Sequence, residues 1–414
     1  MFQKVLLVFF SLFAQLFLGQ ESLKLMSYNL LEFPEANPPN RELILKDILD
    51  TYEPDLFMVC ELQSGFGGNL ILNSSLNDTD SRYASATFIP NQSGIADLQQ
   101  LLFYRRDKMT LEAESVVQTN VRDINHYTLR LHTANGSVNP IVLEIYIAHL
   151  KSSEGGSNQN ERLNMVEAFL SDTNSLNPDA YVIFAGDLNL YSSTEPAYVA
   201  LLDPSNFITM ADPIDTPGAW SNNSNFQGVH TQSSRISSGP FGAGAGGGLD
   251  DRFDFILVSE NLLADPDLHY LEDSYHSYGN NGNCFNLSIN DSACDGTYGE
   301  SLRELLYNMS DHLPVIMQLE TDETIVLETP DVVLQGILQL KSTLIPQQLE
   351  LQFPDNGTHE VVLYNAMGLK IAEHYFSGRE NAVWDVSYLP NGFYLLKDVS
   401  LPRSKAIKFL KVSI

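Results

Sequence analysis

The chain has 414 residues, of which 43% are hydrophobic, and it carries a net charge of −29 at pH 7. This composition excludes general disorder, and the length is sufficient for one large domain and a smaller one. Almost all of the acid excess lies before residue 325, which argues against a protein that simply coats nucleic acid, because such a surface repels polyanions. An enzyme that handles phosphate through metal ions and local basic residues is not excluded.

The N-terminal segment, residues 1–20, has one Lys followed by a dense apolar run that ends in small or polar residues. This pattern is typical of a signal peptide cleaved near Gly19 or Gln20, rather than of a membrane span or a buried first helix. We therefore expect a secreted protein, extracellular or at the cell surface, whose mature form is monomeric and has no transmembrane segment.

Residues 21–321 are predicted to form one domain, in which strand-like apolar runs alternate with a few helical patterns. Helices are expected at 41–52 and 160–173, where apolar residues recur at helical spacing. Strands are expected at 23–28, 55–60, 101–106, 127–133, 141–150, 180–186, 252–259 and 313–319. Many strands with interspersed helices favour a layered α/β or α+β fold.

A long loop is predicted at 221–251, where the chain is rich in Asn, Ser and Gly and includes the run GAGAGGG. A strand pattern follows directly, so we interpret the loop as part of the domain rather than as a boundary. Loops of this length are often lids or binding loops, although a simple surface excursion fits equally well.

The three cysteines are few for a secreted protein. Cys284 and Cys294 bracket a polar loop and could close it in an oxidising compartment. Cys60 lies in an apolar stretch and is expected to be a buried free thiol.

Residues 328–414 are predicted to form a separate, small β-sandwich. The acid excess ends here, short alternating strands follow, and Asn391-Gly392 is a strong turn signal. No cluster of catalytic residue types is present in this part of the sequence.

Five short segments of the first domain place acid, amide or imidazole groups at the ends of apolar strands. The residues are Asn29, Glu61, His149, Asp187 with Asn189, and Asp311 with His312, and Asp254 shortly precedes the last pair. Carboxylate and amide oxygens such as those of Glu61, Asp311 and Asn29 are ligands suited to Mg²⁺. His312 offers a proton-transfer group beside the metal, and a carboxylate such as Asp254 can fix its tautomer.

Asp187 and Asn189 lie two residues apart on an extended segment and therefore on one face, where they could orient a water and bind a developing oxyanion. Each motif alone is weak, since a turn or a strand cap explains it as well. Their joint occurrence in this order is specific.

In these motifs the chain resembles the endonuclease/exonuclease/phosphatase superfamily over roughly residues 22–320. The resemblance implies a four-layered α/β sandwich, two packed mixed β-sheets flanked by helices, with the site at one edge. It implies that Asn29, Glu61 and Asp311 bind the metal, that Asp187 orients the water and that Asn189 contacts phosphate. His312 matches the general base or acid, Asp254 its carboxylate partner, and His149 the second histidine of the deoxyribonuclease and sphingomyelinase branches.

Arg122 is a candidate for the family's phosphate-binding arginine, because a guanidinium can bind phosphate in a bidentate manner. Arg130 competes with it. His230 and Arg235 could also touch substrate, although we interpret them as loop residues.

The last 80 or so residues resemble a C-terminal sorting domain of the Bacteroidetes type IX secretion route. The match rests on VVLYNAMG, on LPNGFY and on the final KFLKV. It implies the type IX machinery as a partner, and a carbohydrate- or surface-binding β module is the rival interpretation.

Together these features predict a secreted Mg²⁺-dependent phosphodiester hydrolase, most simply an extracellular nuclease that uses a metal-activated water; Mn²⁺ or Ca²⁺ could replace or join Mg²⁺. A sphingomyelinase-like lipid or small-molecule phosphodiesterase is the first alternative, which the acidic surface favours slightly. A non-catalytic adhesin that keeps the fold is the second, although no expected metal ligand is missing.

Overall fold

The computed structural model describes residues 21–78, 80–93, 98–327, 338–353, 357–366, 368–378, 381–400 and 406–412. The chain divides into two compact units, the first ending at Thr329 and the second beginning at Pro330. The expected signal peptide at 1–20 lies outside the described residues. None of the described helices combines the length and the apolarity needed to cross a membrane.

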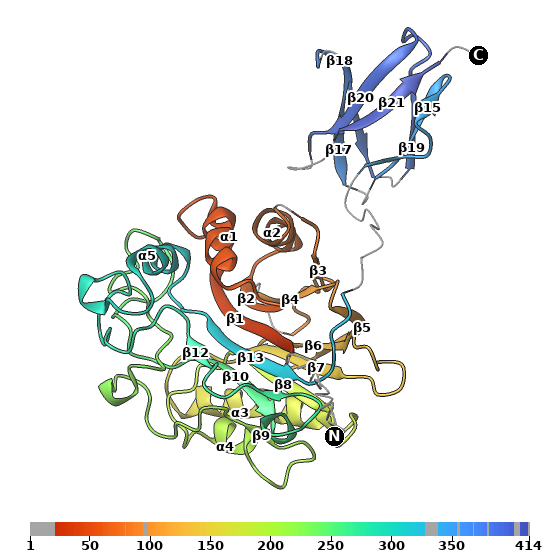
Figure 1. Ribbon diagram of the computed structural model, residues 1–414. Helices are drawn as coiled ribbons and strands as arrows, with labels where there is room; N and C mark the ends of the chain where they lie inside the picture. The colour runs from red at the N-terminus through yellow and green to blue at the C-terminus, as the bar shows by residue number, and fades with distance from the viewer. Residues whose placement is uncertain are drawn as a thin grey trace, which may run out of the picture. The chain divides into compact units, whose positions relative to one another are not determined.

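The first sheet of the first unit has the strand order β11-β13-β1-β2-β4-β3, and β12 also pairs with β13 (Figure 1). Its strands are β1 (Glu21–Phe33), β2 (Leu56–Leu62), β3 (Tyr83–Ser85), β4 (Gln99–Arg105), β11 (His269–Tyr270), β12 (His276–Ser277) and β13 (Val315–Thr321). β1 pairs with β2 in parallel and with β13 antiparallel, so the sheet is mixed.

The second sheet has the order β5-β6-β7-β8-β10-β9. Its strands are β5 (Met109–Val117), β6 (Ile124–Leu131), β7 (Val142–His149), β8 (Tyr181–Asp187), β9 (Met210–Ala211) and β10 (Asp254–Ser259). β7 and β8 are parallel, whereas β10 is antiparallel to β8.

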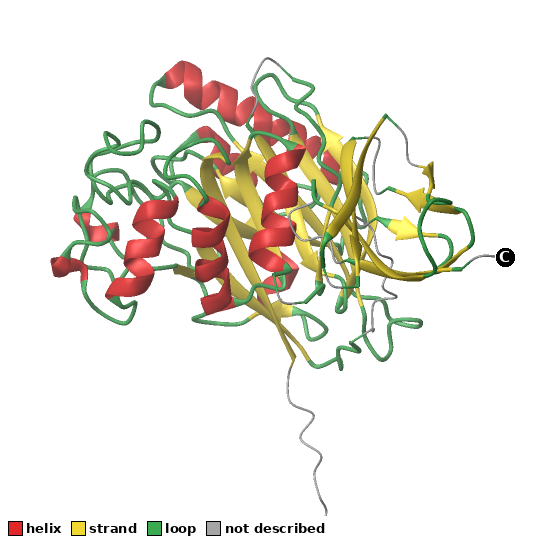
Figure 2. Cartoon of the chain, turned by 90° about the horizontal axis from the view of Figure 1, so that it is seen from above, coloured by secondary structure: helices red, strands yellow, loops and turns green. Residues whose placement is uncertain are grey.

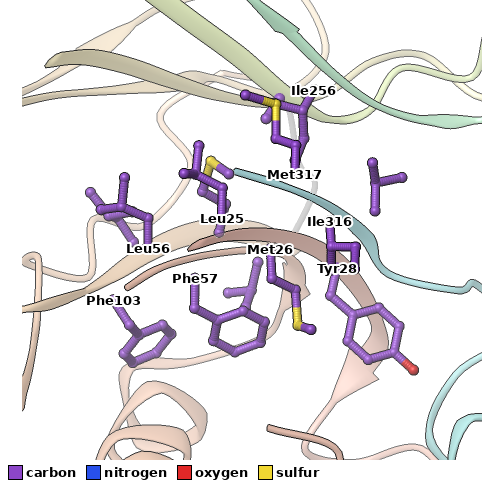
Figure 3. Packing of buried hydrophobic residues seen from close by; sticks show 14 of the residues in the cluster. Leu25, Met26, Tyr28, Leu56, Phe57, Phe103, Ile256, Ile316 and Met317 are labelled. Carbon is purple, nitrogen blue, oxygen red and sulfur yellow. The ribbon is translucent and has the colours of Figure 1, made fainter. Parts of the chain in front are cut away.

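The two sheets pack face to face through apolar side chains. Figure 3 shows Leu25 of β1 and Met317 of β13 directed toward Ile256 of β10, while Met26 and Phe57 point to the opposite side of the first sheet. This follows from the strand period of two, which sends neighbouring side chains to opposite faces. Both faces of the first sheet are therefore buried.

Helices cover the outer faces of both sheets and complete four layers (Figure 1). In the view from above, helices lie across the strands (Figure 2). The first sheet carries α1 (Arg41–Tyr52), α2 (Gly65–Leu70), the π-helix η1 (Ile71–Leu76) and α5 (Glu300–Met309), and the second carries α3 (Gly156–Thr173) and α4 (Pro196–Leu201). Three 3₁₀ turns lie in connections: η2 (Ser224–Phe226), η3 (Glu260–Leu263) and η4 (Ser292–Cys294). The predicted α/β sandwich is confirmed, and α3 begins at Gly156 rather than at residue 160.

The second unit contains two further sheets around a core of its own that includes Trp384, Phe376 and Phe409. Their strand orders are β14-β16-β19 and β15-β21-β20-β17-β18. The strands are β14 (Gln339–Leu340), β15 (Leu344–Ile345), β16 (Gln348–Gln352), β17 (Thr358–Asn365), β18 (Lys370–Ser377), β19 (Asn381–Asp385), β20 (Gly392–Asp398) and β21 (Ile407–Lys411). This is the small β-sandwich expected from the alternating pattern.

The cysteines behave as their surroundings predict. Cys284 and Cys294 form a disulfide in the first unit. Cys60 is a buried free thiol, and burial raises its pKa well above the ordinary range. Cys60 is therefore an unreactive core residue.

Candidate active site

The predicted site residues lie at one edge of the two packed sheets. Asn29 and Glu61 stand near the ends of the parallel strands β1 and β2. His149 and Asp187 end the parallel strands β7 and β8 and are register partners, and Asp254 begins the antiparallel β10 opposite Asp187. Strand ends that share one edge bring polar groups from distant parts of the sequence together.

Asn29 links the two sheets. Its Nδ2 donates to Glu61 Oε1 at 3.0 Å and to Asp187 Oδ2 at 3.0 Å, while its Oδ1 accepts from the backbone of Leu31. His149 Nε2 lies 3.4 Å from Asp187 Oδ2 and 4.0 Å from Glu61 Oε1. Ligand atoms of Glu61, His149 and Asp187 all fall within 4.8 Å of one another, which is the spacing of a metal-binding group.

His312 lies on the other side of Asp187. Its Nδ1 is 2.7 Å from Asp254 Oδ2, and its Nε2 is 3.8 Å from Asp187 Oδ2. Both His312 and Asp254 are at most 3% exposed. The carboxylate fixes the orientation of the imidazole, as a histidine that transfers protons requires.

Asp311 enters the site from the segment before β13. Its Oδ1 is buried and has no hydrogen-bond partner, whereas its Oδ2 accepts from the backbone of Ala245 at 2.6 Å. Its charge also acts on Glu61: burial first and then Asp311 raise the pKa of Glu61 above its ordinary value. Glu61 and Asp311 are therefore close enough to repel each other.

The site concentrates negative charge away from water. Burial raises the pKa of Asp187 to about 7, with Asp254 and Glu61 adding to the shift and His312 opposing it. Burial lowers the pKa of His312, but Asp254, Asp187 and Asp311 together outweigh burial and raise it well above the ordinary value. Because isolated buried carboxylates are costly, this donor set fits a divalent cation that neutralises them.

The carboxylates of Asp311, Glu61 and Asp187 are oxygen donors that Mg²⁺ or Mn²⁺ accept, and the imidazole of His149 lies beside them. Burial, with Arg122 and His312 adding to it, lowers the pKa of His149 well below its ordinary value, so its ring stays neutral. The residues present therefore suit a metal of this class.

Arg122 lies beside the site, and Arg130 does not. Arg122 Nη1 donates to the carbonyls of His149 and Leu150, and its buried Nε has no partner. Arg130 instead forms an exposed ion pair with Glu112 on the outer strands β5 and β6. The location favours Arg122 over Arg130 as the basic residue of this site.

Asn189 follows β8 in a left-handed backbone conformation, with φ of 51°. Its backbone N–H donates to Asp187 Oδ1 at 3.2 Å, and its Nδ2 lies 3.4 Å from the carbonyl of Leu150. The turn brings the backbone N–H of Asn189 to the carboxylate of Asp187, so the extended segment predicted for these two residues is wrong: the strand ends at Asp187 and the chain turns at Asn189.

His230 and Arg235 are fully buried and support the loop. His230 Nε2 contacts the carbonyl of Trp220 at 2.9 Å, and Arg235 donates to the carbonyl of Tyr307 and stacks on Phe241. Their interpretation as loop residues agrees with these contacts.

Two site contacts were not predicted from the sequence. Gln232 places its Nε2 2.5 Å from His312 Nε2 and 3.4 Å from Asp311 Oδ2, and Ala245 donates its backbone N–H to the same carboxylate. Neither residue belongs to a motif. A backbone N–H donor also does not depend on the type of side chain, so the sequence gives no indication of it.

No family model matches the chain, and no curated protein matches it. Solved structures do resemble it. TDP2 from D. rerio in complex with a single-strand DNA product has 18% identity and a TM-score of 0.49, and covers 72% of this chain and 99% of its own. The catalytic domain of human Nocturnin, with bound sulfate, has 15% identity and a TM-score of 0.46, and covers 72% and 96% respectively.

An endonuclease/exonuclease/phosphatase protein from Bacteroides vulgatus has 12% identity and a TM-score of 0.46, covering 73% of this chain and 99% of its own. Similarity at this level supports no conclusion about activity. The function therefore has to be argued from the geometry of the site.

Proposed function

We propose that this protein is a secreted, metal-dependent phosphodiester hydrolase that acts as an extracellular nuclease. The proposal depends on one observation: the amide of Asn29 contacts Glu61, Asp187 and His312. These three residues come from separate segments that span 251 residues of the sequence. A structural role does not require so many ionisable groups to be buried together. Hydrolysis of a phosphate ester uses all of them.

Asp187 holds and deprotonates the attacking water. Its carboxylate is fixed by Asn29 and by the backbone N–H of Asn189, and its pKa of about 7 suits a general base near neutral pH. His312, held by Asp254 through Nδ1, directs Nε2 toward the phosphoryl group and moves a proton there.

Asn189 and His149 contact the phosphoryl oxygens, with Arg122 as the basic group behind them. Neutral His149 and the Asn189 amide are donors placed where charge develops in the transition state. Glu61 and Asp311, with Asn29 beside them, would hold a divalent cation, which would supply charge neutralisation when bound. We propose Mg²⁺, with Mn²⁺ or Ca²⁺ as substitutes.

The location outside the cell is supported by the Cys284–Cys294 disulfide, because disulfides persist in oxidising compartments. In this proposal residues 1–20 direct export and residues 328–414 act as a type IX sorting domain. Mass spectrometry of the native protein tests the export signal: a mature N-terminus near residue 20 in the medium agrees with the proposal, and an intact N-terminus in the cytoplasm contradicts it.

The experiment on activity compares plasmid DNA, RNA, sphingomyelin and bis-p-nitrophenyl phosphate, each with Mg²⁺ and with EDTA. We expect cleavage of nucleic acid that EDTA abolishes. Asp187→Ala should reduce the rate by about 10²- to 10⁴-fold, because it removes the proposed base, while the thermal unfolding curve shows a folded protein. Wild-type rates in Asp187→Ala would refute the site assignment.

The same panel separates the alternatives. Cleavage of sphingomyelin with intact DNA and RNA would replace the nuclease by a sphingomyelinase-like enzyme. Absence of any metal-dependent hydrolysis would leave the adhesin interpretation and reject the enzyme.

A further inference from the structure

The loop between Thr231 and Leu249, called here the Gln232 loop, runs beside the segment that carries Asp311 and His312. Leu313 donates its N–H to the carbonyl of Thr231 at 2.7 Å, and Ser234 donates to the carbonyl of Asp311 at 2.8 Å. Between these two contacts, the backbones of Gln232 and His312 form an isolated antiparallel β-bridge. The loop is therefore held by its backbone directly against the two site residues.

The side chain of Gln232 reaches both of them. Its amide nitrogen lies 2.5 Å from His312 Nε2 and 3.4 Å from Asp311 Oδ2. This contact holds the Nε2 side of the ring, while Asp254 holds the opposite nitrogen, Nδ1. Two anchors then fix the plane of the imidazole.

The glycine run reaches Asp311 from the other end of the loop. Ala245 donates its backbone N–H to Asp311 Oδ2 at 2.6 Å. Gly244, with φ of 86°, makes this approach possible, because a Cβ there would lie 2.9 Å from Asp311 Cγ and 3.0 Å from its Oδ2. The close approach explains why this position carries no side chain.

Both donors use Oδ2 and leave Oδ1 buried without a partner. A carboxylate held at one oxygen presents the other in a fixed direction. Partners of this kind orient metal ligands and contribute to metal affinity.

A second loop, residues 284–294, forms backbone hydrogen bonds with the Gln232 loop and is called here the bracing loop. Leu249 donates its N–H to the carbonyl of Leu287 at 3.0 Å, and Ile289 donates to the carbonyl of Ser234 at 2.9 Å. The Cys284–Cys294 disulfide closes this bracing loop. The glycine-rich segment is thus tied into the protein at both ends.

We propose that Gln232 and the Gly244–Ala245 backbone are positioning elements of the active site, which hold the Asp311 carboxylate and the His312 imidazole in the orientation needed for metal binding and hydrolysis. The proposal rests on the proposed function for its catalytic part. Its metal-binding part is independent of which substrate is cleaved.

The test compares Gly244→Ala with Gly242→Ala in the full-length protein. Both glycines have positive φ, 86° and 72°, so alanine introduces similar backbone strain at each. A Cβ at Gly242 meets only Asn37 Nδ2 at 3.9 Å, whereas a Cβ at Gly244 displaces Asp311. Thermal unfolding of both variants measures how much stability each loses through backbone strain, separately from any change in metal binding.

Calorimetric titration with Mn²⁺ is the readout. We expect Gly244→Ala to weaken binding by roughly 10- to 100-fold, and Gly242→Ala to leave it within about 3-fold of wild type. Equal Mn²⁺ affinities for the two variants, or equal losses, would overturn the role of Gly244–Ala245. This result stands even if the wild-type protein hydrolyses none of the substrates, in which case the proposed function fails separately.

The role of Gln232 is tested with Gln232→Met, which keeps the length of the side chain and removes the donor. We expect kcat to fall roughly 10-fold or more with KM nearly unchanged, and partial recovery of kcat in Gln232→Asn, which retains the amide. A change in KM alone, or no change in either constant, would refute a positioning role for Gln232.

Discussion

The two units of the chain bury polar groups in different ways. In the C-terminal unit, β16 and β19 alternate buried and exposed positions, so one face of the strand reaches water. In the first unit, β8 and β10 are buried almost throughout, because they lie between a helix layer and the other sheet. A carboxylate at the end of such a strand has no easy access to water.

The buried ionisable groups differ accordingly. His359 and Asp398 of the C-terminal unit form one pair at 2.8 Å, in which Ser400 also donates to Asp398. In the first unit, Asp254 and Asp311 each retain a buried oxygen without a partner. A buried ion pair whose hydrogen bonds are satisfied contributes to the stability of the fold. Buried carboxylates that retain unpaired oxygens are instead available to bind a ligand.

The largest effect is expected from exchanging one histidine in each unit for alanine. His312→Ala should lower the rate of hydrolysis by about 10²- to 10⁴-fold, because it removes the proton-transfer group. His359→Ala should leave the rate unchanged and instead reduce the unfolding free energy, by about 1–3 kcal/mol, because the buried Asp398 loses its hydrogen bond with the imidazole.

Initial rates on bis-p-nitrophenyl phosphate and denaturant unfolding are measured on both variants. If His359→Ala loses as much activity as His312→Ala, the claim that His312 serves catalysis while His359 serves only stability is wrong.

A smaller effect is expected from pH. The folded pKa of Asp187, about 7, lies above its ordinary value of 3.8, so the stability that this group contributes is fully present below pH 4 and is lost as the pH rises through 7. The raised pKa of His312 acts in the same direction. The metal-free protein should therefore lose stability between about pH 4 and pH 7.

Asp187→Asn removes the main part of this dependence. In EDTA at pH 8 it should be more stable than wild type by up to about 4 kcal/mol, because each unit of the upward pKa shift counts about 1.4 kcal/mol. Mg²⁺ should stabilise the wild type more than the variant. Unfolding midpoints measured across this pH range provide the check. If the unfolding midpoints of the two proteins changed with pH in parallel, burial would not raise the pKa of the Asp187 carboxylate.

Much of the fold could be predicted because its apolar patterns are strong. The stripe at 41–52 became α1, and the run at 252–259 contains β10. β5 was not predicted, because most of Met109–Val117 is exposed and its sequence lacks a clear apolar pattern. The strand forms because it pairs with β6 along its length.

The site residues could be predicted because their side chains carry the chemistry and follow recognisable strands. Gln232 and Ala245 could not, for a physical reason. Their positions depend on a loop that returns to Asp311 only when Leu287 and Ile289 brace it, and no local pattern encodes that return.

The most direct measurement is X-ray diffraction from crystals grown with Mn²⁺, with the anomalous signal used to place the ion. We predict an ion about 2.1 Å from carboxylate oxygens of Glu61 and Asp311, with Asp187 and His149 around the same space. An ion bound only to surface carboxylates, or no anomalous peak among these residues, would contradict the claim that the two sheets assemble a metal-dependent active site.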